Sequence, residues 1–441
     1  MLVKFWGVRG SIPAPMTSGQ IENKIKLAFQ AAAADQINLA DHEAVDKFVA
    51  RLPVSIRGTV GGNTSCISVE TSEDLVIIDA GTGIRELGDA LMQREFGQGQ
   101  GEAAIFFTHT HWDHIQGFPF FRPLFVPGNR FKIYYLHTYA EQVLREQMKA
   151  QWFPVQFNRI EADIQFERIE EGQTIRVGAM TINSKALQHP GKAYSYRVEN
   201  GTSAVVLATD GEYKNLSATH TKKYIDFFAG ADVLIFDAMY SVRESIIRED
   251  WGHSSALIGA DIARQAGVKR LVLFHQDPAA EDDEVWRVYE ETREYMSQDL
   301  GNALPEVLVA TEGLEIDLSD TPDFSVTTQQ VGNVSILSLE GHFDAYGAEV
   351  FINQFDQLLR QDDRSRIVLS MQDVTELNMA GVKALLDART QTYSLALVKL
   401  PGHIRRVLEL AVTVDFFAIY DDLDTALEAL SISNNNHYET V

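Results

Sequence analysis

One short stretch constrains this chain more than any other: Ala103–Phe121, which reads AAIFFTHTHWDHIQGFPFF. The apolar run at its start predicts a strand that is buried on both faces. The strand ends at a polar turn with the pattern H-x-H-x-D-H, and six residues of this turn hold four potential metal ligands: His109, His111, Asp113 and His114. Imidazole and carboxylate groups suit a borderline divalent cation such as zinc. The stretch therefore predicts a metal site at a strand end, where rigid backbone holds ligands in position.

The alternative is a histidine-rich turn that is simply exposed to water. Such a turn would not normally lie between two apolar segments, and here Ile115–Phe121 follows it with few polar breaks. His109 and His111 are two residues apart, so both imidazoles can face one cation. Asp113 and His114 fall around the turn, where a second cation could bind. We therefore favour a site for two metal ions.

The H-x-H-x-D-H motif resembles the signature of the metallo-β-lactamase superfamily. The resemblance extends from Met1 to about Asp317 and is closest to the branch that contains RNase Z and the small phosphodiesterases. It implies an α/β fold, a four-layer αββα sandwich, and two divalent ions, of which zinc is the first choice and manganese or iron the alternatives. It also implies three ligands after later strands: His189 for the first metal, Asp210 as a bridge, and His275 for the second metal.

The same resemblance implies a proton donor for the leaving group. In RNase Z-like phosphodiesterases an acidic residue orients a histidine in a G-H-S turn, and here Gly252-His253-Ser254 follows a strand that ends at Asp237. Asp237 stands where RNase Z typically has Glu. The alternative for His253 is a purely structural position before a helix that Ser254 caps. With Asp113 among the catalytic groups, a metal-bound hydroxide is the expected nucleophile.

Four further residues are candidates for contact with the ligands or the substrate: Asp79, Arg9, Ser11 and Asn63. In the family the position of Asp79 supports the metal site, and its alternative role is to cap a helix. Arg9 and Ser11 belong to the loop VRGSIPAP, which is either a structural turn or a phosphate contact at the mouth of the site. Asn63 lies in the tight turn GGNTSC.

The chain has 441 residues, which suits two or three domains. We predict a metallohydrolase domain over residues 1–318, a polar linker over 319–330, a small α/β domain over 331–430, and a disordered tail over 431–441. Apolar residues at helical spacing predict two helices inserted at about 17–57. This insertion could form a lid over the pocket or a dimer contact.

The strand–helix alternation after Val331 predicts a small domain with a parallel sheet. Gly341-x-x-Asp344 and the turn Asn378-Met379-Ala380-Gly381 resemble a STAS domain, the fold of anti-sigma-factor antagonists. Members that are switched by phosphorylation have Ser where Met379 stands. A methionine has no hydroxyl group, so that switch is not available here. The resemblance implies a regulatory or assembly role through a protein partner.

Composition excludes several classes of function. The net charge is −24, from 38 basic and 62 acidic residues, which argues against a surface that holds long nucleic acid by its phosphates. Cys66 is the only cysteine, so no internal disulfide can form. No leader and no membrane span are evident. We expect a cytoplasmic protein without membrane contact that forms a homodimer.

The leading functional hypothesis is a binuclear-metal phosphodiesterase that hydrolyses a small or cyclic nucleotide-like phosphodiester. Its proton donor favours this substrate over a carboxylic ester, thioester or lactone, because an alkoxide is a poor leaving group. A regulatory binding protein that senses a nucleotide is a third hypothesis, and the complete ligand set argues against it. RNA end processing is less favoured because no separate basic arm is evident. A flavodiiron role is disfavoured, since no flavin domain is attached and His111 stands where such sites tend to use Glu.

Overall fold

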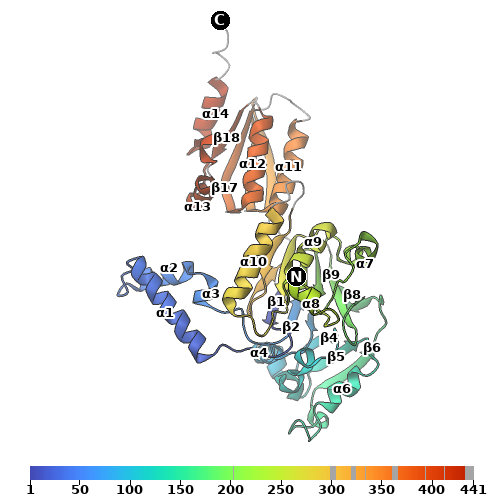
Figure 1. Ribbon diagram of the computed structural model, residues 1–441. Helices are drawn as coiled ribbons and strands as arrows, with labels where there is room; N and C mark the ends of the chain where they lie inside the picture. The colour runs from blue at the N-terminus through green and yellow to red at the C-terminus, as the bar shows by residue number, and fades with distance from the viewer. Residues whose placement is uncertain are drawn as a thin grey trace. The chain divides into compact units, whose positions relative to one another are not determined.

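A computed structural model describes most of the chain, namely residues 1–201, 203–297, 304–318, 324–332, 334–359, 366–392, 394–411 and 413–432. The chain forms two compact units (Figure 1). The first comprises Met1–Leu300 and Val307–Ser319, and the second comprises Gly301–Glu306 and Asp320–Val441. In the part of the chain that the structure describes, no helix has the length and apolar character that a membrane span requires.

Two seven-stranded sheets form the centre of the first unit as described, in the orders β14-β1-β2-β3-β4-β5-β6 and β13-β12-β11-β10-β9-β8-β7. The strands of the first sheet are β1 (Leu2–Gly7), β2 (Cys66–Glu70), β3 (Leu75–Ile78), β4 (Glu102–Phe106), β5 (Arg130–Tyr135), β6 (Asp163–Arg168) and β14 (Glu315–Asp317). The strands of the second sheet are β7 (Ile175–Val177), β8 (Met180–Leu187), β9 (Ala193–Asn200), β10 (Ser203–Ala208), β11 (Val233–Asp237), β12 (Arg270–Phe274) and β13 (Glu306–Val309).

The sheets pack face to face, and helices cover their outer faces. Alternate residues of β3 show why: Val76 and Ile78 join the core between the sheets, whereas Leu75 and Ile77 join a second core beneath helices. On the other sheet, Gly259 belongs to helix α9 (Ala256–Ala266), and a Cβ at this position would lie 2.6 Å from the ring of Phe236. The backbone of α9 therefore approaches β11 closely. The predicted four-layer αββα sandwich is confirmed.

Short helices and turns connect these strands. The α-helices of this unit outside the insertion are α4 (Ile84–Leu91), α5 (Trp112–Ile115), α6 (Ala140–Glu146), α7 (Ala218–Phe228), α8 (Val242–Ile247), α9 (Ala256–Ala266) and α10 (Asp282–Ser297). The 3₁₀ turns are η1 (Glu95–Gln98), η2 (Phe118–Phe120), η3 (Arg122–Phe125) and η4 (Phe157–Arg159).

The insertion between β1 and β2 is helical, as predicted, but it contains three helices where two were expected. They are α1 (Ser18–Ala34), α2 (His42–Arg51) and α3 (Val54–Arg57). Thr17 and Gln20 form a capping box at the start of α1. Pro53 follows α2 and is the N-cap of α3, because proline ends one helix and can begin the next.

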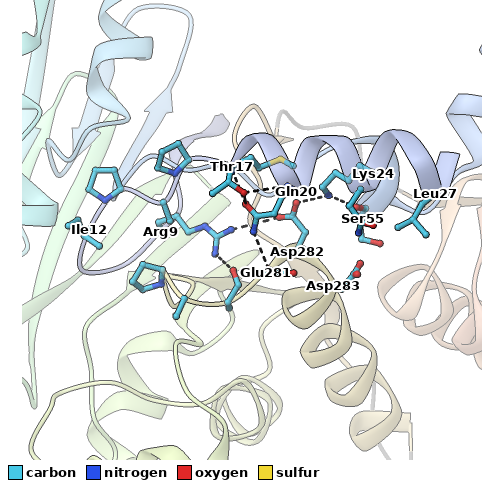
Figure 2. Close-up of a pocket in the computed structure, with 18 residues that line it drawn as sticks. Arg9, Ile12, Thr17, Gln20, Lys24, Leu27, Ser55, Glu281, Asp282 and Asp283 are labelled. Atoms are coloured by element: carbon cyan, nitrogen blue, oxygen red, sulfur yellow. Dashed lines mark hydrogen bonds and ion pairs between the residues drawn. The ribbon is translucent and has the colours of Figure 1, made fainter. Parts of the chain in front are cut away.

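Asp282, the first residue of α10, fastens this insertion to the rest of the unit (Figure 2). Its carboxylate accepts hydrogen bonds from Lys24 Nζ at 2.8 Å, the Val60 N–H at 3.0 Å and Thr59 Oγ1 at 3.1 Å. Arg9 lies 3.8 Å away across a buried ion pair. Arg9, Lys24 and Asp282 also line the adjoining cavity of about 310 Å³.

The second unit contains, in its described residues, a five-stranded sheet in the order β15-β16-β17-β18-β19. Its strands are β15 (Phe324–Val331), β16 (Val334–Phe343), β17 (Arg366–Leu377), β18 (Ser394–Val398) and β19 (Ala418–Tyr420). Its helices are α11 (Ala345–Leu359), α12 (Met379–Gln391), α13 (Gly402–Leu410), the 3₁₀ turn η5 (Val414–Phe416) and α14 (Leu423–Ile432). Only the β15–β16 pair is antiparallel among the described pairings.

Two elements of this unit extend past the predicted boundaries. Residues 324–330, expected as the end of a polar linker over 319–330, belong to β15 and pair with β16. This segment is polar because β15 is an edge strand with mostly exposed residues. The remaining linker residues, 319–323, lie outside the described residues. Helix α14 reaches Ile432, past the predicted boundary at 431, and residues 433–441 also lie outside the described residues.

Candidate metal centre

The seven predicted ligands come together at one edge of the sandwich, although they are far apart in sequence. His109, His111, Asp113 and His114 follow β4, and the others follow three strands of the second sheet: His189 after β8, Asp210 after β10 and His275 after β12. Asp210 and His275 have positive φ values of 55° and 59°. Such left-handed backbone is uncommon for residues with a Cβ, and at these positions it turns the chain sharply away from the strand.

One group of potential ligands consists of His109, His111, His189 and Asp210, whose ligand atoms all lie within 4.8 Å of one another. His189 Nε2 lies 3.0 Å from His111 Nδ1. Asp210 Oδ2 lies 3.7 Å from His109 Nε2 and 3.6 Å from His189 Nε2. Three imidazoles and one carboxylate oxygen therefore surround one point.

A second group consists of Asp113, His114, Asp210 and His275, again within 4.8 Å. Asp210 Oδ1 lies 3.2 Å from Nε2 of both His114 and His275. Asp113 Oδ2 lies 3.3 Å and 3.2 Å from the same two nitrogens. Asp210 thus belongs to both groups and directs one oxygen to each, which is the arrangement expected of a bridging carboxylate.

Hydrogen bonds on the outer side of the imidazoles decide which ring nitrogens carry protons. His114 Nδ1 donates to Asp79 Oδ2 at 2.7 Å, and His189 Nδ1 donates to the Gly252 carbonyl at 2.9 Å. Thr108 Oγ1 donates to Asp79 Oδ2 at 2.8 Å, so its oxygen accepts from His109 Nδ1 at 3.1 Å. Nε2 of each of these rings is therefore left with a lone pair.

These lone pairs converge without a donor between them. Among the described residues, His109 Nε2 is buried and has no hydrogen-bond partner. His114 Nε2 and His275 Nε2 lie 3.3 Å apart, and carboxylate oxygens surround both. Acceptors that face one another repel unless a cation lies among them. The donor set of neutral nitrogens and carboxylate oxygens therefore fits two divalent metal ions.

The pKa values show how strongly the site attracts positive charge. Burial lowers the pKa of His114, but Asp210, Asp113 and Asp79 raise it well above its ordinary value, so this ring carries an extra proton unless a cation takes its place. Burial lowers the pKa of His109 well below its ordinary value, and His114 adds to the effect, so His109 is a neutral ligand. Burial alone would raise the pKa of Asp113 and of Asp210, but the neighbouring histidines bring both well below the ordinary value. Both carboxyl groups are therefore ionised, and they attract positive charge to the space between them.

Asp79 and Thr108 stabilise the histidine-rich turn by hydrogen bonds. Asp79 Oδ1 accepts the Thr108 N–H at 2.8 Å, and its Oδ2 accepts from Thr108 Oγ1 and His114. Asp79 is fully buried and has a φ of 63°, so its position comes from the strand end rather than from a helix cap. The sequence reasoning missed Thr108, although a hydroxyl residue directly before the first histidine is the available signal.

The loop residues named as substrate or ligand contacts have different surroundings. Ser11 reaches the site through its backbone, whose N–H donates to Asp113 Oδ2 at 2.7 Å. Arg9 does not reach the ligands: its guanidinium donates to the carbonyls of Gly61, Asp277 and Ala280. Its phosphate-contact role is therefore not supported, and its structural alternative fits the geometry.

Asn63 forms its hydrogen bonds with Glu312 and not with the metal-ligand candidates. Its side-chain amide donates to Glu312 Oε2 at 3.1 Å, and its backbone N–H donates to Glu312 Oε1 at 2.6 Å. Glu312 is distant in sequence, so the tight turn alone gave no sign of this partner. The structure places Asn63 in a structural role at the base of the loop that carries Arg9.

Asp237 and His253 form a hydrogen-bonded pair beside the second group. His253 Nδ1 donates to Asp237 Oδ2 at 2.8 Å, and the His253 ring stacks on His275 with centroids 5.1 Å apart. Burial lowers the pKa of His253, but the charge of Asp237 and its hydrogen bond, with Asp210 and Asp113, raise it to about 9. The structural alternative for His253 took Ser254 as the N-cap of α9, but the N-cap is Ser255.

The loop before His253 is held by contacts that the sequence did not reveal. Glu212, which is buried, accepts the Asp250 N–H at 3.0 Å. Gly252 has a φ of 88°, and a Cβ there would lie 2.2 Å from His189 Nδ1. Only a glycine allows this backbone to approach the ligand histidine so closely.

Comparisons with known proteins show what each part of the chain is similar to. Residues 75–276 match the family model described as a beta-lactamase superfamily domain, and residues 326–413 match that described as Mlab, STAS domain. Ribonuclease Z of Gemmatimonas aurantiaca is 22% identical over 316 residues, which cover 62% of this chain and 95% of that protein. Ribonuclease Z of Haloarcula marismortui is 24% identical over 322 residues, which cover 62% and 99% respectively.

Among solved structures, the metallo-beta-lactamase fold protein YhfI from Bacillus subtilis aligns with a TM-score of 0.47 at 18% identity. That alignment covers 71% of this chain and 98% of YhfI.

Proposed function

This chain joins a hydrolase domain of the metallo-β-lactamase superfamily to a STAS domain, and from that premise we propose that it is a binuclear metal-dependent phosphodiesterase. We propose as substrate a small or cyclic nucleotide-like phosphodiester. Zinc is the first choice for the two ions, with manganese or iron as alternatives. The observation that carries this proposal is the convergence of seven ligand side chains, with the two oxygens of Asp210 directed to different histidine groups.

Two divalent cations bound at this site would supply Lewis acidity and a water of lowered pKa. The chain's own residues provide the rest. Asp79 and Thr108 fix the histidine tautomers, and the Ser11 N–H holds Asp113 in place. These contacts fix the positions of the ligands before substrate arrives, so little reorganisation is needed during the reaction.

His253 supplies the proton that the leaving group needs. Asp237 accepts from Nδ1, which leaves Nε2 as the nitrogen that can transfer a proton. The raised pKa keeps His253 protonated near neutral pH. An alkoxide that leaves phosphorus is strongly basic, so proton donation accelerates its departure. This pair favours a phosphodiester over the ester, thioester and lactone alternatives, and it has no use in a protein that only senses a nucleotide.

The STAS domain gives the chain a second, non-catalytic part. We propose that it regulates the hydrolase or assembles it with a protein partner, and that the chain forms a homodimer. Met379, at the position that carries Ser in phosphorylation-switched members, is the first residue of α12 and is 65% exposed. Any control through this surface would therefore work without phosphorylation at residue 379.

The proposal is tested with 3′,5′-cyclic AMP, whose hydrolysis needs the departure of an alkoxide, and added Zn²⁺ or Mn²⁺, comparing the wild-type protein with His253→Ala. We expect a loss of about 10²-fold or more in kcat, while elemental analysis still finds both ions. The matched control is His220→Ala, which changes an exposed histidine on α7. Unchanged turnover in His253→Ala would remove this residue from the mechanism. Faster turnover of a p-nitrophenyl carboxylic ester than of the phosphodiester would favour the ester alternative.

A further inference from the structure

A hollow of about 490 Å³ lies next to the histidine-rich turn and has no role in the reaction described so far. Four segments of the chain form its walls: residues 13–15, 62–63, 82–85 and 117–120. The residues that matter for its chemistry are Pro13, Pro15, Gly62, Arg85, Gly117 and Phe120.

The walls of this hollow continue directly from the metal centre. Ser11, whose N–H donates to Asp113 Oδ2 at 2.7 Å, is two residues before Pro13 in the same loop. Ala80 joins the other side: its N–H donates to the His114 carbonyl at 2.7 Å, and its carbonyl accepts the Gly117 N–H at 2.9 Å. Hydrogen bonds therefore link two wall segments of the hollow to Asp113 and His114 of the metal centre.

Glycines keep these walls close together. A Cβ at Gly62 would lie 2.8 Å from the Ala14 carbonyl oxygen, and a Cβ at Gly117 would lie 2.0 Å from the Gly81 carbonyl oxygen. Any side chain at either position would push the backbone segments apart. A substitution at Gly62 or Gly117 would therefore change the walls of the hollow.

The lining suits a flat aromatic group. Phe120 is 55% exposed although its ring meets Phe153 edge to face at 5.2 Å, so much of it remains available for stacking. The two proline rings offer apolar surface opposite polar loops. Arg85 is already paired with Glu86 and, at 3.6 Å, with Asp89. Arg85 lines the same hollow, and a guanidinium group can stack on an aromatic ring as well as pair with an anion.

We propose that this hollow receives the base of a nucleoside whose phosphodiester lies at the metal centre. The inference rests on the proposed function and makes it more specific, since it assigns the non-leaving part of the substrate. Stacking on aromatic rings tolerates different bases, because every base has an aromatic face. Phe120 is then a specificity-determining residue that distinguishes nucleoside esters from simple alkyl esters.

The test compares two substrates with the same leaving group: thymidine 5′-(p-nitrophenyl) phosphate and methyl p-nitrophenyl phosphate. For each we measure kcat/KM with the full-length, metal-loaded protein. We expect Phe120→Ala to lower the ratio of the nucleoside ester to the methyl ester about 10-fold, and Phe120→Tyr to retain it. Phe29→Ala, which removes a 61% exposed ring on α1, is the matched control and should leave the ratio unchanged.

Binding is measured separately, by calorimetry with thymidine 5′-monophosphate, and should weaken about as much in Phe120→Ala. If Phe120→Ala changes neither the ratio of the two kcat/KM values nor the affinity for thymidine 5′-monophosphate, the inference is overturned, even if the enzyme is an active phosphodiesterase. If the wild-type protein hydrolyses neither ester, the proposed function fails, and the calorimetry still decides whether the hollow binds a nucleotide.

Discussion

At the scale of single residues, the pair formed by Asp237 and His253 determines how the proposed reaction depends on pH. His253 donates its proton only in the charged form, so activity is present below its pKa and is lost as the pH rises through that pKa. The pKa is raised to about 9, mainly by Asp237 against the effect of burial. Asp113 and Asp210 also raise the pKa of His253, and cations bound between them would cancel their contribution. The alkaline limb of the pH–activity profile, where activity falls as the pH rises, should therefore lie below pH 9.

We expect Asp237→Asn to move this alkaline limb toward lower pH, because the amide removes the negative charge that stabilises protonated His253. It should also lower kcat by about 10-fold or more. The measurement is kcat/KM for 3′,5′-cyclic AMP, which has an alkoxide leaving group, as a function of pH. Asp226→Asn, which changes an exposed carboxylate paired with Lys222 on α7, is the control and should leave the profile in place. An alkaline limb that does not move in Asp237→Asn would show that another group titrates there.

At the scale of elements, the strands and their polar ends could be read from the sequence, whereas loop contacts could not. Buried apolar runs such as β10 end where a polar residue begins, so the ligands that the family resemblance implies could be carried over onto Asp210 and His275. Arg9 and Asn63 looked equally promising, but their partners lie more than two hundred residues away, at Asp277 and Glu312. No local pattern records such a pairing.

Because long-range contacts cannot be predicted from a local pattern, the prediction also differed from the structure in the helical insertion and in edge strand β15. Helix α3 is a single turn after Pro53, too short to show a periodic pattern. Strand β15 carries polar residues because only one of its edges pairs, and its sequence therefore resembles a linker. Both errors concern short elements whose identity depends on their neighbours.

The attachment of the insertion gives a prediction at this scale. Asp282→Ala would leave Lys24, the Val60 N–H and Arg9 without the buried carboxylate that they share. We expect a loss of about 3 kcal/mol in the free energy of unfolding, because the remaining groups stay partly buried without a partner. Urea unfolding measures it.

Asp283→Ala is the matched control for this change, since Asp283 is the next residue on α10 and is exposed. Its effect should stay within about 0.5 kcal/mol. Equal effects of the two substitutions would show that the buried network does not hold the insertion in place.

At the scale of the whole molecule, the chain consists of two units with separate cores. The ligands, the proposed proton donor and the hollow all belong to the first unit, Met1–Leu300 with Val307–Ser319. The ribonuclease Z of Gemmatimonas aurantiaca is matched over 95% of its length by only 62% of this chain. The second unit has its own sheet and its own buried cluster around Phe343 and Leu369. All the described groups to which the proposed reaction assigns a role therefore belong to the first unit.

We expect a protein that ends at residue 319 to fold and to bind two metal ions, because a domain with its own hydrophobic core can fold by itself. It should hydrolyse bis(p-nitrophenyl) phosphate with a kcat/KM within about threefold of that of the full-length protein. Elemental analysis and steady-state kinetics measure this. A soluble, folded truncation that binds metal but has lost its activity would show that the STAS domain takes part in the reaction.

The shared position of Asp210 has a consequence for how a lineage of such proteins can change. A substitution at His111 or at His275 damages one half of the centre and leaves the other half to be reused. A substitution at residue 210 removes an oxygen from both halves at once. Descendants that retain this aspartate can explore new chemistry by altering one histidine at a time, whereas descendants that lose it have no partly working intermediate to build on.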